Sequence, residues 1–585
     1  MCGIFFSVGD TEPAYPEEDT LCNIKNRGPD SYQAHQVTFS SQGIGEQECG
    51  KHLTFISSVL SLRGATIATQ PFIDPPSESV LCWNGEAWKL SNEVLAGNDT
   101  YRIFQLFLES IKPPNNGTLP CTRQVPLGTL AQAISTIAGP FAFVFYDRPW
   151  SRIIYGRDFL GRRSLLQGRD YKANFVISSV CAGTPSNCFE EVSTDGIHVL
   201  DLTRDDPLSA VETIPWLHGT TSPSIYLSTP IPPMNQRIPT TETITPLVRT
   251  LSSVVELENL LRQSVKLRVQ GIPRFPSCSP GAAKVAVLFS GGLDCTVLAR
   301  LVHDLLPVDE PVDLLNIAFE NPRVAAASLA KNATLNSVYE ECPDRKTGRS
   351  SLAELCRVCP TRQWRFVCIN IPYSETLQHR DTIRRLMRPH NTEMDLSIAC
   401  ALYFSARGIG EIAGKDDNEP PVSYETSARV LLSGLGADEL FAGYQRHALA
   451  FARQGFKGLI DEIDLDVGRL GKRNLGRDDR VISNWGREAR YPYLDEAFMT
   501  WALQRPVWEK CGFGIPSDAS EQAGSERDTH TGEPEDIEPG KKALRLVAWN
   551  LGMKNVAREK KRAIQFGSRT AKMESGRTKG TGVIS

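Results

Sequence analysis

The stretch KVAVLFSGGLDCTVLARL, residues 284–301, restricts the possible folds more than any other part of the chain. It opens with a continuous apolar run ending at Phe289, typical of a strand covered on both faces of a sheet. Ser290, Gly291 and Gly292 then form a tight turn, and apolar residues at helical spacing start near Leu293. A buried strand followed directly by a helix indicates an α/β unit with a parallel sheet.

The same alternation continues downstream. Further apolar runs predict strands at VDLLNIAF (312–319), QWRFVCINI (363–371) and ARVLLSG (428–434), with helices expected between them at 374–387 and 394–408. This order predicts a doubly wound parallel sheet.

The turn after the first strand has the properties of a phosphate-binding loop. Unpaired N–H groups at a helix start attract anions, and glycine lets the backbone approach a phosphate. Asp294 lies beside this turn, and a carboxylate next to phosphates is best explained by a bridging Mg²⁺. The chain has no Gly-Lys-Ser/Thr element, so phosphate transfer of the P-loop kind is not indicated.

A second loop repeats this logic in VLLSGLGADELFAGYQRH. A strand at 430–432 runs into Ser433 and Gly434, and Asp438 lies at the start of the following helix. Asp438 therefore marks a second anion or Mg²⁺ position. Two such loops at the carboxyl ends of parallel strands fit one ATP between them.

The first 180 residues have a different texture. Short apolar stretches such as IFFSVGD, LTFISSVLSLRG, SVLCWNGEAW and PFAFVFYDRPW are separated by turn residues, which predicts many strands in packed sheets. TYRIFQLFLESI is the main helix candidate. We expect a first domain at 1–184, a connector rich in Pro, Thr and Ser at 185–255, and an α/β domain at 256–585 with a disordered acidic insertion at 516–540.

Composition excludes several classes of function. The net charge of −4 gives no strong attraction to nucleic acid or anionic membranes, and no apolar run is long enough to span a bilayer. The fifteen cysteines are scattered, which without a leader favours reduced thiols and a cytoplasmic location. Cys356 and Cys359 form one CxxC pair, but the neighbouring Cys342 and Cys368 are single, so buried thiols are favoured over zinc.

Several motifs carry a family resemblance. The Ser-Gly-Gly-x-Asp loop resembles the pyrophosphate loop of the ATP pyrophosphatase superfamily. SGGLDC, SGLGADELFAGY and NWGREARYPYLD resemble landmark motifs of asparagine synthetase, and MCGIF, NRGPD, SLRG, CWNGE and GND resemble the class II glutamine amidotransferase domain. AFEN and the helix MDLSIACALYFSARG make the chain most similar to the eukaryotic asparagine synthetase domain-containing branch. The resemblance implies an N-terminal sandwich of stacked antiparallel sheets with flanking helices, beside an α/β domain of the ATP pyrophosphatase type.

The resemblance also implies the site residues. Cys2 would become the N-terminal nucleophile after removal of Met1, its own amine serving as base, while Asn84 and Gly85 form an oxyanion hole. Arg63 would bind the glutamine α-carboxylate, Asp99 with help from Glu86 its α-ammonium, and Arg27 would order the loop over Cys2. The implied ATP-binding residues are Phe289, Ser290, Gly291, Gly292, Leu293, Asp294, Cys295, Ala318, Phe319, Ser433 and Gly434, with Mg²⁺ at Asp294 and Asp438.

The implied reaction joins two half-reactions. Glutamine would release ammonia at Cys2, and ATP would adenylate the β-carboxylate of aspartate. Ammonia would cross an internal passage to give asparagine, glutamate, AMP and pyrophosphate. The implied partners are thus glutamine, ATP and aspartate or another carboxylate, and the sequence does not indicate an oligomeric state.

Three departures from the family pattern leave alternatives open. Leu435 stands where asparagine synthetases carry a glutamate, Asn474 stands where an acid is expected although Asp478 and Asp479 are nearby, and Cys295 replaces a serine. The pattern does not decide which of the basic residues Lys560, Lys561 and Arg562 meets pyrophosphate. The alternatives are the same chemistry on another carboxylate, and a degenerate homologue that binds nucleotide and serves as a scaffold.

Overall fold

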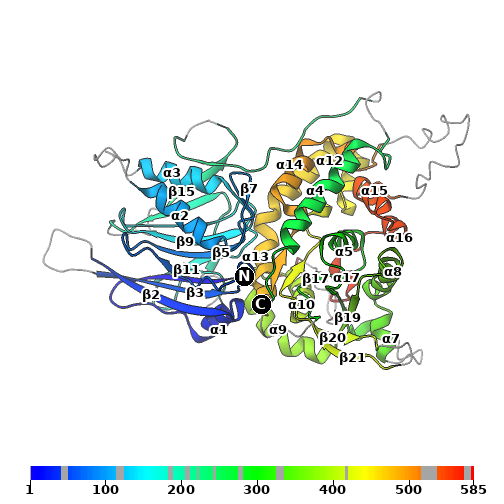
Figure 1. Cartoon of the computed structure of the whole chain (residues 1–585), viewed down its shortest axis with the longest axis horizontal. Coiled ribbons are helices and arrows are strands. Elements are labelled where there is room, and N and C mark those ends of the chain that lie inside the picture. Colours follow the sequence, from blue (N-terminus) through cyan, green and yellow to red (C-terminus); the bar gives the residue numbers. More distant parts are fainter. Residues whose placement is uncertain are drawn as a thin grey trace, which may run out of the picture.

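A computed structural model describes most of the chain. The described residues are 2–40, 50–112, 124–181, 189–204, 211–219, 223–240, 246–274, 281–324, 335–414, 419–514, 537–571, 573 and 581–584. Figure 1 shows the antiparallel sheets of the first half lying beside the helix-covered sheet of the second half, with both termini near their boundary. Most of the predicted disordered insertion at 516–540, namely residues 516–536, lies outside the described residues.

Two sheets form the first half. The six-stranded sheet has the order β13-β11-β12-β1-β3-β2 and the seven-stranded sheet the order β16-β15-β14-β10-β9-β5-β4. Their strands are β1 Gly3–Gly9, β2 Ser31–Ser40, β3 Gly50–Val59, β4 Phe72–Ile73, β5 Val80–Gly85, β9 Phe141–Asp147, β10 Arg152–Arg157, β11 Leu166–Arg169, β12 Phe175–Ser178, β13 Phe189–Glu191, β14 Gly196–Asp201, β15 Glu212–Leu217 and β16 Leu227–Ser228. A small sheet joins β6 Lys89–Leu90 to β7 Glu93–Val94 and β8 Ile137–Ala138.

Strand β9 is buried on both of its faces. Val144 and Tyr146 point into the core between the two sheets, whereas Phe143 and Phe145 point toward the helices α2 Thr100–Ile111 and α3 Gln124–Ser135. Both faces of β9 are buried, so its run is continuously hydrophobic rather than alternating. The predicted helix at TYRIFQLFLESI is confirmed as α2, whereas α3 and α1 Glu18–Arg27 were not predicted.

The interpretation of 185–255 as a connector is wrong for its first part. Strands β13 to β16 lie there, and β14 pairs with β10 in the second sheet. The pattern was missed because these strands are short and separated by polar turns. Only the part after Ser228 runs without a helix or strand, within its described residues, up to α4 Ser252–Val269.

The second half is built on one sheet of order β21-β20-β19-β18-β17-β22-β23. Its strands are β17 Val285–Leu288, β18 Val312–Phe319, β19 Trp364–Ile371, β20 Ile409–Ile412, β21 Val422–Glu425, β22 Val430–Leu432 and β23 Glu488–Arg490. Strands β17, β18, β19 and β22 are parallel as predicted, and β23, which was not predicted, is parallel to β22. Strands β20 and β21 at one end of the sheet are antiparallel, so the sheet is mixed. The mixed α/β architecture with several sheets is thereby confirmed.

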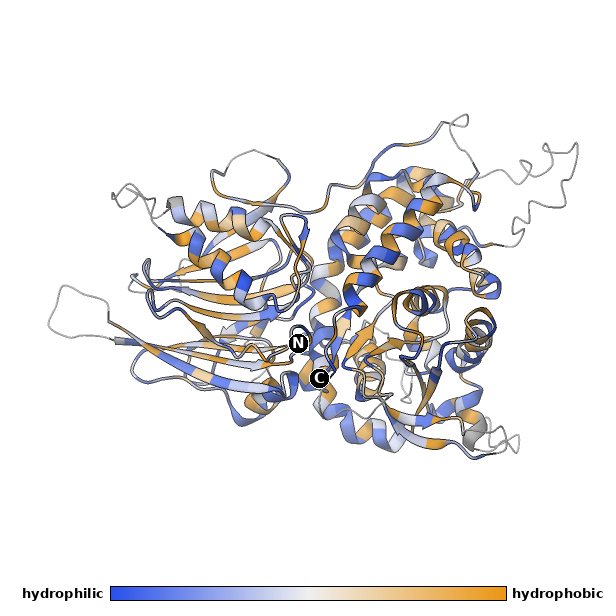
Figure 2. Cartoon of the chain, viewed as in Figure 1, coloured by the Kyte–Doolittle hydropathy of each residue, from blue (hydrophilic) through white to orange (hydrophobic). Residues whose placement is uncertain are grey.

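Helices cover both faces of this sheet. They are α5 Leu293–Leu305, α7 Leu335–Glu340, α8 Pro343–Val358, α9 Tyr373–Met387, α10 Glu393–Arg407, α11 Ala437–Leu440, α12 Gln445–Arg473, α13 Leu475–Ser483, η3 Pro492–Leu494, α14 Glu496–Gln504, η4 Val507–Glu509, α15 Lys542–Asn550, α16 Lys554–Arg558 and α17 Ile564–Gly567. Figure 2 shows hydrophobic residues concentrated on the strands, while the helices alternate hydrophobic and hydrophilic residues. No helix within the described ranges is both long and apolar enough to cross a membrane.

Strand order fixes where a ligand site can form. Strands β17 and β22 are neighbours, but the chain leaves β17 toward β18 on one side and returns to β22 on the other. The loops after β17 and β22 therefore meet at the point where strand order reverses. Crevices at such switch points, outside the carboxyl ends of the strands, are where open α/β sheets bind ligands.

Candidate functional site

Cys2 lies buried directly before β1. Its backbone N–H donates to Asn84 Oδ1 at 2.9 Å, and its carbonyl accepts from Arg27 Nε at 3.2 Å. Burial raises the pKa of the Cys2 thiol above its usual value. The thiol is therefore held in place but needs a base to become a nucleophile at neutral pH.

Asn84 offers a donor that nothing else uses. Its side chain is fully buried at the end of β5, and Nδ2 has no hydrogen-bond partner among the described residues. Because its Oδ1 is held by the Cys2 N–H, the amide presents Nδ2 as a free donor in this pocket. Buried donors without partners are rare, so this one indicates a place for an oxygen that the protein itself does not supply.

Gly85 is required by close packing. A Cβ at this position would lie 2.8 Å from both the Phe141 Cβ and the Pro140 carbonyl oxygen. Only glycine lets β5 run this close to β9 while Asn84 turns toward Cys2.

Arg63, Glu86 and Asp99 gather around the loop that follows β5. Arg63 donates to the Ala87 carbonyl at 2.8 Å and lies 3.5 Å from Glu86. Asp99 accepts the Ala87 N–H at 2.7 Å. Burial raises the pKa of Asp99 and raises that of Glu86 to about 7. The predicted glutamine-binding residues are thus brought together next to Asn84.

The loop after β17 is shaped by two glycines and a serine. Gly291 has a φ of +80°, and a Cβ there would lie 2.4 Å from the Gly348 nitrogen of α8. Ser290 Oγ accepts the Gly292 N–H at 3.3 Å, and Gly292 is the N-cap of α5. The predicted start of the helix at Leu293 is confirmed, while the strand ends one residue earlier than predicted, at Leu288.

The second loop touches the first. A Cβ on Gly434 would lie 2.9 Å from the Asp294 Cβ, so the two loops are in direct contact. The Ser433 N–H donates to the Arg490 carbonyl at 3.0 Å, which ties this loop to β23. Both loops therefore open into one common region at the carboxyl ends of β17 and β22.

Asp294 and Asp438, the two predicted Mg²⁺ positions, share one cation. Lys541 Nζ lies 2.8 Å from both Asp294 carboxylate oxygens and 2.8 Å from Asp438 Oδ1. Lys561 also pairs with Asp438. Although burial acts to raise the pKa of Asp438, these two lysines hold it well below its usual value.

Lys541 was missed by the sequence analysis, although a signal exists. Lys541 is the N-cap of α15 and Lys542 is its first residue. Cations at a helix N-terminus oppose the helix dipole, so a lysine there indicates an anionic partner elsewhere. Of the three basic candidates, Lys561 contacts Asp438, whereas Arg562 donates to Thr347 Oγ1 at 2.7 Å.

Ala318 and Phe319 end β18 in a covered position. Both are fully buried, and the Phe319 N–H donates to the Ser568 carbonyl at 3.1 Å. The C-terminal segment thus occupies the backbone donor of one predicted nucleotide contact. Cys295 is also buried, and its thiol donates to the Gly292 carbonyl at 3.3 Å, within the loop itself.

The acids near Asn474 belong to the boundary between the halves. Asp479 pairs with Arg27 at 2.7 Å, and Asp478 pairs with Arg477 at 2.7 Å. Both acids are thus engaged by arginines at this boundary, and among the described residues neither takes the place of an acid in the two loops. Leu435 packs against the hydrophobic core instead.

A buried chain of ion pairs links the two halves. Arg163 pairs with Glu488 at 2.9 Å, and Arg490 pairs with Glu488 at 2.6 Å and with Glu86 at 3.1 Å. Arg162 lies at the same seam, since it reaches Glu496 at 2.5 Å. Buried pairs of this kind are costly to break because the remaining charge is left uncompensated.

Metal ligands are sparse in the structure. Within the ranges that the structure describes, no three His, Cys, Asp or Glu side chains converge as a metal site. This disfavours zinc at Cys356, which is exposed, and Cys359, which is buried. It is compatible with Mg²⁺ at Asp294 and Asp438, because Mg²⁺ commonly uses one or two carboxylates together with substrate phosphates and water.

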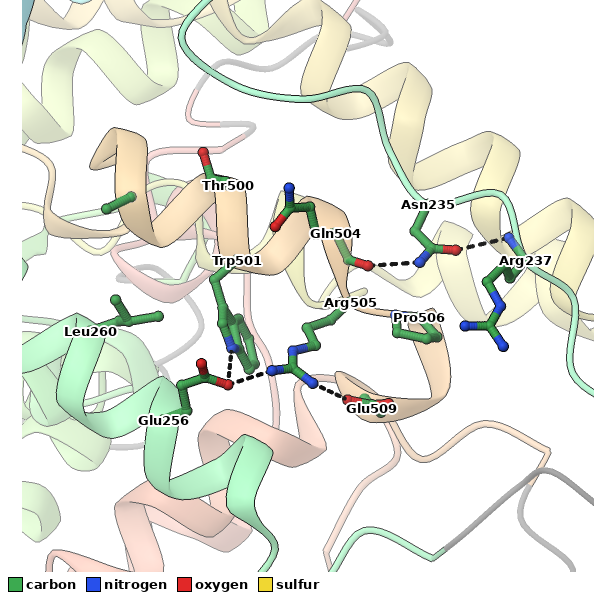
Figure 3. A pocket seen from close by; sticks show the side chains of 11 residues that line it. Asn235, Arg237, Glu256, Leu260, Thr500, Trp501, Gln504, Arg505, Pro506 and Glu509 are labelled. Carbon is green, nitrogen blue, oxygen red and sulfur yellow. Dashed lines mark hydrogen bonds and ion pairs between the residues drawn. The ribbon is translucent and has the colours of Figure 1, made fainter.

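A separate pocket of about 490 Å³ lies between α4 and α14 (Figure 3). Three of its charged groups pair with one another: Arg505 lies 2.5 Å from Glu256 and 3.3 Å from Glu509. None of the predicted site residues lines it.

Comparisons with known proteins agree with the resemblance. A scan against protein-family models finds no match. "Asparagine synthetase domain-containing protein 1" of Bos taurus is 32% identical, covering 99% of this chain and 97% of that protein. "Asparagine synthetase [glutamine-hydrolyzing]" of Rattus norvegicus is 22% identical, covering 89% and 79%. The structure of a B. subtilis glutamine phosphoribosylpyrophosphate amidotransferase covers 54% of this chain and 66% of its own at 15% identity, but its TM-score of 0.22 does not establish a shared fold. On its sequence identity, the chain belongs to the asparagine synthetase domain-containing protein family.

Proposed function

We propose that this protein is a glutamine-dependent and ATP-dependent amide synthetase that converts aspartate to asparagine. The observation that carries the proposal is the orphan Nδ2 of Asn84 beside a buried N-terminal cysteine, in a chain that also brings two phosphate-type loops together. Family membership supports it, because a rat relative is named as a glutamine-hydrolysing asparagine synthetase. Its unpaired cysteines, within the described residues, support a cytoplasmic location.

The first half would release ammonia from glutamine. With Met1 removed, the Cys2 nitrogen becomes an amine that can accept the thiol proton. The sulfur then attacks the glutamine side-chain amide, and Asn84 Nδ2 donates to the oxygen that becomes negative. Ammonia leaves, and a thioester on Cys2 remains to be hydrolysed to glutamate. Arg63 and Asp99 would hold the two charged ends of the amino acid.

The second half would use ATP to activate the acceptor carboxylate. Backbone N–H groups of the turn 290–292, at the start of α5, suit phosphate oxygens. Asp294 and Asp438 would hold Mg²⁺, which would neutralise the charge of the phosphates. Lys561 adds positive charge on the same side of the pocket. The products would be asparagine, AMP and pyrophosphate, with ammonia crossing the buried seam between the halves.

A second candidate is the same chemistry on a different carboxylate. Leu435 favours it, because a side chain without acid–base function lies where asparagine synthetases carry a glutamate. A nearby acid such as Glu439 is committed elsewhere, since it accepts from the Tyr444 hydroxyl at 2.6 Å.

One assay separates these readings. Purified protein is incubated with glutamine, ATP, Mg²⁺ and aspartate, and asparagine, pyrophosphate and glutamate are measured. Asparagine with equimolar pyrophosphate supports the first proposal. Pyrophosphate that appears only with another carboxylate supports the second. Nucleotide binding with no pyrophosphate from any carboxylate would refute both and leave a nucleotide-binding scaffold.

A further inference from the structure

The place between Asp294 and Asp438 is already filled by a positive charge of the protein itself. Lys541 Nζ lies 2.8 Å from three carboxylate oxygens, and its side chain is only 3% exposed. These carboxylates come from the two loops that would hold the phosphates. A lysine ammonium is therefore lodged where a bridging cation would have its protein ligands.

The charge balance of this cluster is complete without a metal. Asp294 and Asp438 contribute two negative charges, and Lys541 and Lys561 contribute two positive charges. A divalent cation entering this buried cluster alone would leave two uncompensated positive charges in a poorly solvated place. Nucleotide phosphates would bring the negative charge that compensates the divalent cation.

The backbone around Lys541 is held by hydrogen bonds, whereas its ammonium lies at the end of a long, flexible side chain. The Lys541 N–H donates to the Phe441 carbonyl at 2.8 Å, and its carbonyl accepts the Arg545 N–H at 3.0 Å. Its φ of +57° is uncommon for a residue with a side chain. Only the flexible four-carbon stem must turn for the ammonium to leave one partner for another.

We propose that Lys541 is a placeholder cation: it excludes free divalent metal from the empty site and transfers to the phosphates when the metal enters together with the nucleotide. Lys541 is then a positioning residue that keeps the two loops together before ATP binds. This inference rests on the proposed use of a metal–nucleotide substrate, but it does not depend on which carboxylate is amidated.

The test measures Mn²⁺ binding to the full-length protein by the electron paramagnetic resonance signal of free Mn²⁺. Wild type is expected to bind Mn²⁺ at this site only when ATP is present. Lys541→Met should bind Mn²⁺ without nucleotide at least about tenfold more tightly than wild type, because the competing charge is gone. Lys541→Arg, which keeps the charge, should continue to exclude the metal.

A matched control is Lys284→Met. Lys284 pairs with Glu310 at 2.9 Å at the other end of β17, so this variant removes one half-buried ion pair from the same sheet. It should leave Mn²⁺ binding at the wild-type level. Asp294→Asn combined with Lys541→Met should abolish the gained binding and so locate it.

The outcomes distinguish this inference from the proposed function. Nucleotide-free wild type that binds Mn²⁺ as tightly as Lys541→Met would overturn the placeholder role, even if asparagine is made. If Lys541→Met does not fold, the wild-type titration is sufficient, because tight Mn²⁺ binding without ATP would itself overturn the placeholder role. If the protein binds Mn²⁺ only when ATP is present but makes no amide, the placeholder role of Lys541 is supported and the proposed synthetase function is refuted.

Discussion

Around Cys2, the Asn84 donor has no partner among the described residues, whereas around Asp294 and Asp438 the charges are already neutralised by Lys541 and Lys561. The first pocket is arranged before its ligand arrives and needs only an oxygen at Nδ2. The second must exchange partners when its ligand arrives. Preorganised donors suit a fixed transition-state charge, while a substrate with several charges requires counter-ions that can move.

The largest expected effect separates the two pockets. Cys2→Ala should abolish glutamine-driven amide formation because it removes the nucleophile, while ammonia supplied directly should still be used by the second half. Amide and pyrophosphate formation with glutamine or with ammonium chloride are the measurements. Loss of both rates in a folded variant would contradict separate sites.

Asp294→Asn is the reciprocal change. Pyrophosphate release should fall by more than about 100-fold, since a metal carboxylate worth several kcal/mol of charge stabilisation is removed. Glutaminase activity should survive, because the Cys2 pocket lies in the other half. A normal synthetase rate would show that Asp294 does not act on the metal.

Asn84→Ala tests whether the unpartnered Nδ2 donates to the oxyanion. Loss of one oxyanion donor should lower kcat for glutamine hydrolysis by about 100- to 1,000-fold with a smaller change in KM. Steady-state glutaminase kinetics give this split. If KM rises and kcat is unchanged, Asn84 binds the ground state and the oxyanion role is wrong. Ammonia-driven synthesis in the same variant is the control.

The smallest effect concerns pH. Burial raises the pKa of Glu86 to about 7, well above its ordinary value. Between pH 4.5 and 7 the folded protein therefore binds more protons at Glu86 than the unfolded chain, and this residue makes stability fall as pH rises. Glu86→Gln should reduce the change in the free energy of unfolding across this pH range by about 1–3 kcal/mol.

Urea unfolding at pH 5 and at pH 7.5 measures the effect, with Glu190→Gln at the exposed edge of the first sheet as the control. An unchanged difference between the two pH values would mean that Glu86 is ionised throughout this range.

The sequence pattern was sufficient to predict those elements whose signals lie in neighbouring residues. The run 284–301 predicted β17, its turn and the start of α5 to within one residue, because a strand buried on both faces and a helix start both leave short-range signals. Strands β18 and β22 were predicted at their observed bounds for the same reason. The strands after residue 185 were missed because they are short and depend on pairing with other strands, such as β13 with β11 and β14 with β10.

The candidate site divides in the same way. The two loops were predictable because their motifs carry the chemistry in adjacent residues, and the family resemblance indicated Cys2 and Asn84. Lys541 was not, because it lies 247 residues from Asp294 and reaches it only when α15 is packed in place. The ion pairs of Arg163 and Arg490 with Glu488 likewise depend on how the halves meet.

The order of residues alone thus determined most buried strands of the second half and which turns can receive phosphate, and the family resemblance indicated the thiol and the amide donor. Only the tertiary structure decided which charges neutralise one another. Hydrophobic periodicity is read along the chain, but an ion pair is a matter of distance in space, and the low-dielectric interior makes a few ångströms between Lys541 and the two aspartates decisive.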